Sequence, residues 1–221
     1  MCFSASASFG AGIVISTIGV VTLKKVSSPA HYYFALIPLF FAIQQFAEGF
    51  LWLALADSSY APLEWMATYV FLFFAQVVWP FWIPFSIYML EKESKNKNIL
   101  KILMVMGTIV SIYLAYCLVT FYVKATIIGQ HISYQQDYPA VFNKYSGLLY
   151  IFATILPPYF SSVKKVWILS VAIFISYIIT TILYDDYIVS VWCFFASIIS
   201  MLILWMMQEV NSPKQAEIEA T

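Results

Sequence analysis

Residues 31–56 read HYYFALIPLFFAIQQFAEGFLWLALA, an apolar run in which Glu48 is the only acidic side chain. A helix that crosses a lipid bilayer needs about 20 consecutive, mostly apolar residues. Six further apolar stretches flank this one, at residues 8–23, 63–90, 99–122, 146–162, 166–184 and 187–207. The pattern predicts an all-α, polytopic membrane protein, folded as a bundle of seven transmembrane helices.

The composition supports this class. The chain has 221 residues, of which 62% are hydrophobic and 10% charged, and its mean hydropathy is +0.85. Soluble domains carry about 25% charged residues. Seven spans and their short connections occupy residues 1–210 as a single transmembrane domain. Residues 211–221 form a short polar tail.

The lysines indicate an orientation. Nine of them fall on one side of the membrane if the chain crosses it seven times: Lys24, Lys25, Lys92, Lys95, Lys97, Lys101, Lys164, Lys165 and Lys214. The other side receives Lys124 and Lys144. Because cytosolic loops are enriched in basic residues, we expect the N-terminus outside and the C-terminus in the cytosol. The expected location is a prokaryotic plasma (inner) membrane.

Composition also argues against several classes of partner. All 11 basic residues are lysine, and the formal net charge is zero. Arginine is the side chain that binds phosphate in a bidentate manner, and a basic excess is the usual sign of nucleic-acid binding. The expected partners are therefore the lipid bilayer and a small molecule or ion, without nucleic acid, and an oligomer is compatible with the sequence.

Glu48 is the strongest candidate for a functional residue, because ionisable groups inside membrane spans are costly and usually face a bundle interior or a wet cavity. Gln44 and Gln45 precede it by four and three residues, and Trp52 follows it by four. Helical spacing places these four side chains on one face. We predict that they line a ligand-binding pocket.

The third stretch supplies two further candidates, Gln76 and Trp79, at a depth comparable to Glu48 on the expected neighbouring helix. Pro80 lacks the amide that would bond the Gln76 carbonyl, and Pro84 does the same for the Pro80 carbonyl. Carbonyls freed in this way, beside glutamines and a carboxylate, could coordinate a cation, a proton or a polar solute. The alternative is that Glu48 and the glutamines only join helices through hydrogen bonds.

Cys2 is the candidate metal ligand. An N-terminal cysteine offers a thiolate and an amine, which together bind soft metals or act as a nucleophile. Cys117 and Cys193 fall in the outer halves of their expected spans. A shared metal or redox site is one interpretation, and packing of two small side chains is the other. A metal ion is thus the cofactor that the sequence suggests.

Two segments leave alternatives open. The connection 124–145 is polar and aromatic, so it is either a lid over an outward cavity or a segment that lies at the interface. The fifth stretch, 146–162, is short and contains Pro157 and Pro158, so it either crosses fully with a kink or crosses in part.

The N-terminal quarter resembles an uncharacterised family of small prokaryotic multi-pass membrane proteins. The resemblance rests on the opening MCFSASASF at residues 1–9, on IPLFFAIQQFAEG at residues 37–49, and on Trp52. Members of that family typically begin with Met-Cys-Phe-Ser-Ala. No activity comes with the family, so the resemblance implies only that Cys2 and the stripe from Gln44 to Glu48 deserve testing.

Three functional hypotheses follow from the sequence. The leading one is a transporter that binds a small solute or ion in an intramembrane pocket around Glu48. The second is a membrane-embedded metal or redox enzyme that uses Cys2 and Glu48. The third is a sensor or accessory subunit of a membrane complex.

Overall fold

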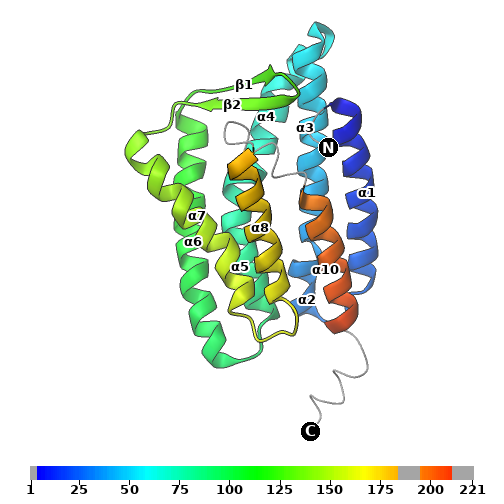
Figure 1. Cartoon of the computed structure of the whole chain (residues 1–221), viewed down its shortest axis with the longest axis vertical. Helices are drawn as coiled ribbons and strands as arrows, with labels where there is room; N and C mark the ends of the chain where they lie inside the picture. The colour runs from blue at the N-terminus through cyan, green and yellow to red at the C-terminus, as the bar shows by residue number, and fades with distance from the viewer. Residues whose placement is uncertain (1–3, 184–194, 211–221) are drawn as a thin grey trace.

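The computed structural model describes residues 4–183 and 195–210, which are mostly helical (Figure 1). Cys2, the start of the last apolar stretch at 187–194, and the tail 211–221 lie outside these residues. Four of the described helical segments are long and apolar enough to cross a membrane: Ala5–Lys24, Pro29–Ala56, Ser58–Leu90 and Ser94–Thr120. The remaining apolar helices are shorter, at Leu148–Tyr159, Trp167–Ile182 and Ala196–Glu209.

Helix α1 (Ala5–Lys24) packs along α3 (Ile37–Ala56). The Ser4 hydroxyl caps its start by accepting a hydrogen bond from the Ala7 amide. Gly12 and Gly19 allow the close approach, since a Cβ at these positions would lie 3.0 Å from Phe46 and 2.5 Å from Leu39. The two helices run antiparallel, because residues later in α1 contact residues earlier in α3.

The short helix α2 (Pro29–Ala35) leads into α3, and a backbone turn at Leu36 separates them. Pro38 suits the first turn of α3, where its missing amide leaves no internal bond unmade. Beyond α3 the chain turns through η1 (Ser58–Leu63) into α4 (Glu64–Leu72). The Asp57 carboxylate holds this turn by accepting hydrogen bonds from the amide and hydroxyl of Ser59.

A π-helix, η2 (Phe73–Val78), separates α4 from α5 (Trp79–Leu90). Proline has no amide hydrogen, so residue 80 cannot donate the usual helical hydrogen bond to the carbonyl of residue 76. This missing bond explains the wider π-helical turn. Two hydroxyl groups from other helices bond to its carbonyls: Ser111 donates to Val77 (2.8 Å) and Tyr150 to Ala75 (2.7 Å).

The carbonyl of Pro80 is covered by helix α6 (Ser94–Thr120). A Cβ at Gly107 of α6 would lie only 1.9 Å from this oxygen, so the two backbones are in close contact. Helix α6 thus packs against the carbonyl that the sequence offered as a ligand for a cation, and coordination by the freed carbonyls stays a prediction. The sequence identified the freed carbonyl but did not show that another helix packs on it.

A β-hairpin follows α6, so the all-α prediction was incomplete. Strands β1 (Val123–Ile128) and β2 (His131–Gln136) pair antiparallel, and Val123 lies opposite Gln136. Gly129 makes the turn with a φ of +63°, a conformation that glycine adopts at little cost. The hairpin lies across one end of the bundle (Figure 1), which we call the hairpin end.

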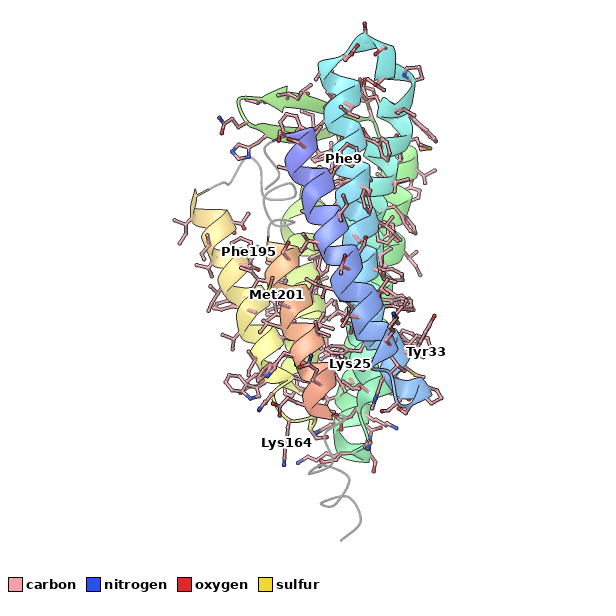
Figure 2. The ribbon with its side chains drawn as sticks, turned by 90° about the vertical axis from the view of Figure 1, so that its right-hand side faces the viewer. Phe9, Lys25, Tyr33, Lys164, Phe195 and Met201 are labelled. Carbon is pink, nitrogen blue, oxygen red and sulfur yellow. The ribbon has the colours of Figure 1, made fainter. Side chains whose placement is uncertain are left out.

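Helices α7 (Ala140–Tyr159), α8 (Trp167–Leu183) and α10 (Ala196–Val210) complete the bundle. Helix α10 packs on α1 and α3, and α7 on α5, α6 and α8. Lys25 and Lys164 both lie toward the end opposite the hairpin (Figure 2), which we call the lysine end. Pro157 and Pro158 of the fifth stretch occupy the last turn of α7.

At the lysine end, polar side chains of other elements bind the connection between α7 and α8. The buried Glu91 carboxylate accepts hydrogen bonds from the amides of Lys92 and Glu93, and from both the amide and hydroxyl of Ser162. The Lys165 ammonium lies 3.0 Å from Glu209 and 4.6 Å from the centre of the Trp205 ring. Lys165 has a φ of 69°, a left-handed conformation that costs a non-glycine residue about 1–3 kcal/mol.

Gly107→Ala should destabilise the protein, because the added methyl group would overlap the Pro80 carbonyl, a backbone atom that cannot move cheaply. Overpacking of this kind costs about 2 kcal/mol. Thermal unfolding in detergent measures the effect. Gly10→Ala is the matched control, since a Cβ there meets nothing within 4 Å. Equal unfolding temperatures for the two variants would contradict the close contact.

Glu91 should give stability that depends on pH. Burial by itself raises the pKa of this carboxyl group, but the hydrogen bonds from Ser162, Glu93 and Lys92 outweigh burial and lower the pKa. A carboxyl group with a folded pKa below its unfolded value of about 4.3 stabilises the fold above that pH and loses this contribution as the pH falls.

Unfolding of the wild type and of Glu91→Gln, compared from about pH 3 to 6, should therefore show a stability difference that shrinks toward acid. Ser162→Ala removes one donor, so it should weaken the same pH dependence while the carboxyl group remains. A difference that stays constant across this range would exclude the role of the carboxylate.

Candidate functional site

Glu48 lies in the interior of the bundle. Its relative exposure is 0%, and those of Gln44, Gln45 and Trp52 are 2%, 1% and 7%. All four belong to α3, which packs on α1, α4 and α10. The helix buries this polar face because its neighbours contact it on several sides. A carboxyl group is therefore held within a mostly apolar segment.

Side-chain hydrogen bonds connect the polar residues of this face with each other and with α5. Gln45 donates from Nε2 to the Glu48 carboxylate at 3.5 Å, a distance at which a hydrogen bond is weak. The Trp79 indole donates to the Gln44 side-chain oxygen Oε1 at 2.9 Å, and Phe41 stacks on the Trp79 ring with centroids 4.1 Å apart. The structure therefore brings Trp79 of α5 against the polar face of α3.

Gln76 belongs to a separate polar group under the hairpin. Its Nε2 donates to the Gln136 side-chain oxygen at 3.0 Å, and its Oε1 accepts from the Tyr138 hydroxyl at 2.9 Å. Burial raises the pKa of Tyr138 well above its usual value, so the phenol remains a neutral donor. Both ends of the Gln76 amide are thus engaged by the segment that follows α6.

The inner face of the hairpin covers the C-terminal part of α3 and the N-terminal part of α4. Ala125 and Ile132 are buried in one cluster with Leu51, Trp52 and Ala67. Tyr134 stacks on Phe71 of α4, with centroids 5.0 Å apart and planes inclined by 4°. The hairpin therefore packs directly against Trp52, the residue of the polar face that is nearest the C-terminal end of α3.

Sequence reasoning missed the hairpin, although a signal was present. Val123, Ala125 and Ile127 alternate with more polar residues before Gly129, and Ile132 and Tyr134 alternate after it. Alternation on both sides of a short turn containing glycine is typical of a hairpin. The polar composition of the segment concealed this period-two pattern.

Three buried polar atoms on α3 and α1 have no hydrogen-bond partner within residues 4–183 and 195–210: Gln45 Oε1, Trp52 Nε1 and Ser8 Oγ. Ser8 lies on α1 with a relative exposure of 0%, and sequence reasoning gave it no role. Buried polar groups in proteins are nearly always hydrogen-bonded. A local cluster of exceptions indicates a place where a ligand or water completes the bonding.

The predicted metal ligand Cys2 falls outside the described residues. Cys117 is a buried free thiol on α6. Over the part of the chain that the structure describes, no group of three His, Cys, Asp or Glu side chains could hold a metal ion.

An open depression of about 460 Å³ occurs at the lysine end, on α2 and the connection that precedes it, and is lined by Val26, Ser27, Ser28, Pro29, Tyr32 and Tyr33. Tyr33 lies near that end in Figure 2. At 1.5 Å per helical residue, Tyr33 and Glu48 are separated by roughly 20 Å along the chain. The depression is therefore distinct from the Glu48 site.

The chain belongs to a family of unknown function (DUF6629), whose model matches residues 1–218. The resemblance found in the N-terminal quarter to an uncharacterised family thus agrees with a match along nearly the whole chain. No curated protein and no solved structure matches this chain.

Gln76→Leu should loosen the hairpin, because it removes both hydrogen bonds to the segment. Two lost bonds of about 1 kcal/mol each predict amide exchange in residues 123–136 that is roughly tenfold faster or more. Hydrogen–deuterium exchange measures this directly. Gln135→Leu is the matched control, because Gln135 is exposed on the outer face of β2. Unchanged exchange in the Gln76 variant would show that the amide does not hold the hairpin.

Proposed function

We propose that this chain is an integral membrane protein that binds a small solute or ion at a buried site around Glu48 and transports it. Four helical segments of sufficient length and apolar character support the membrane assignment. The three shorter apolar helices are the candidates for the remaining crossings of a seven-helix bundle.

The orientation proposed is N-terminus outside and C-terminus in the cytosol of a prokaryotic plasma membrane. Lys25 and Lys164 share one end of the bundle (Figure 2), as the rule that cytosolic loops are basic requires. The hairpin and the η1 turn would then face the exterior.

The observation that carries the proposal is the complete burial of Glu48 on the long apolar segment Pro29–Ala56. Acidic residues at the centre of a membrane helix cost about 2.5–3.5 kcal/mol on insertion scales. Hydrogen bonding between helices would need only a neutral amide at this position. The carboxyl group is better explained by a ligand that it binds.

Packed side chains lie on both sides of Glu48 along the bundle. The hairpin covers Trp52 at one end. At the lysine end, a cluster of large apolar side chains, including Phe34, Ile37, Ile87 and Leu100, fills the space between the helices. Transport through the Glu48 site would require each end to open in turn.

Glu48→Gln should abolish ligand binding while the fold is kept, because the amide has nearly the same shape but carries no charge. Native mass spectrometry and elemental analysis of gently solubilised protein should detect a stoichiometric small molecule or ion in the wild type and lose it in the variant. Proteoliposomes given proton, Na⁺ or solute gradients would then test transport.

Glu64→Gln is the matched control, since it removes a carboxylate at the start of α4 outside the proposed site. It should bind and transport as the wild type does. The proposal fails if Glu48→Gln retains the same bound species and the same fluxes as the wild type.

A further inference from the structure

Three unpartnered polar atoms beside Glu48 define what kind of ligand can complete the site. Trp52 Nε1 is a donor, Gln45 Oε1 an acceptor, and Ser8 Oγ both. Their side chains are more than nine-tenths buried. A buried group left without a hydrogen bond costs about 1–3 kcal/mol, so together they give a strong drive to bind a complementary molecule.

The helix geometry places these atoms in one region. Gln45, Glu48 and Trp52 follow each other by three and four residues, so they share one face of α3. The adjacent Gly49 faces α1, because a Cβ there would lie 2.9 Å from the Phe9 ring, and Figure 2 shows Phe9 near the hairpin end of α1.

Ser8 is brought to the same region by α1. Ala5 packs against the cluster that contains Trp52, and Gly12 packs against Phe46. Ser8 lies between Ala5 and Gly12 on one helical face, so it meets α3 at a level between Trp52 and Phe46. That is the level of Glu48.

The mixture of donors and acceptors discriminates among ligands. A bare metal cation cannot accept the Trp52 N–H, and a simple anion is repelled by the Glu48 carboxylate and has no hydrogen to give to Gln45 Oε1. A hydroxyl group donates and accepts through the same atom. Several adjacent hydroxyls would therefore satisfy Gln45, Glu48, Trp52 and Ser8 together.

We infer that the ligand of the Glu48 site is a small neutral polyol, with Trp52 Nε1 and Ser8 Oγ as specificity-determining groups. This inference rests on the proposed function. The Glu48 carboxylate and the Gln45 oxygen accept hydrogen bonds from hydroxyls of the polyol, and the Trp52 indole donates to one of its oxygens. Glycerol and erythritol are the smallest molecules with several adjacent hydroxyls, so they are the probes chosen for the test.

Stopped-flow light scattering of proteoliposomes that contain the full chain tests the inference. After a hyperosmotic step with glycerol or erythritol, wild-type vesicles should shrink and then reswell faster than protein-free vesicles. Trp52→Phe keeps an aromatic ring but deletes the N–H, and Ser8→Ala deletes the hydroxyl. Each should slow protein-dependent reswelling about tenfold, the effect of one lost hydrogen bond to a buried group.

Trp65→Phe is the control, because Trp65 is 70% exposed on α4, and it should behave as the wild type. No protein-dependent reswelling with either polyol, or reswelling unaffected by Trp52→Phe and Ser8→Ala, overturns the inference. Faster initial shrinkage without reswelling would show that the site holds water only, and it overturns the inference as well.

The same vesicles separate this inference from the proposed function. Glu48-dependent proton or Na⁺ flux without polyol entry would remove the polyol and leave transport through the Glu48 site in place. Polyol entry that is lost in Trp52→Phe but unchanged in Glu48→Gln would instead remove the role of Glu48.

Discussion

The carboxyl group of Glu48 is the constraint around which the half of this bundle nearest the hairpin is arranged. An acidic side chain on an apolar helix must be enclosed by groups that compensate for the loss of water. Gln45 donates to it, Gln44 on the same face is bonded to Trp79, and the small residues of α1 bring that helix close enough to cover the face. The hairpin then closes the region above Trp52.

A second constraint comes from the prolines of the third stretch. Pro80 removes one internal hydrogen bond, and the backbone responds by widening into the π-helix Phe73–Val78. Hydroxyls of Ser111 and Tyr150 bond to carbonyls in that turn, and Gly107 lets α6 lie on the Pro80 carbonyl. This irregular turn positions Trp79 toward α3 and Gln76 toward the hairpin, and so it links the polar face to the cover above it.

The sequence predicted the elements of the site better than their grouping. Gln44, Gln45, Glu48 and Trp52 were assigned to one face from their spacing alone, and they are all buried. Gln76 was grouped with them by its depth in the next span, yet its amide bonds Gln136 and Tyr138. The depth of a residue along a helix follows from its number. The direction of its side chain depends on the local helical twist, and the π-helix Phe73–Val78 changes that twist at Gln76.

By itself the sequence determined that the chain is mostly helical, where four long apolar segments lie, and which carboxyl group stands inside one of them. These properties are local, since they depend on hydrophobic runs and on the period of a single helix. Only the tertiary structure decided that Ser8 meets the polar face, that α6 covers the Pro80 carbonyl, and that residues 123–136 fold over Trp52. Those contacts join residues far apart in the chain. They depend on how closely two backbones approach each other, and this distance cannot be predicted from the periodicity of a single helix.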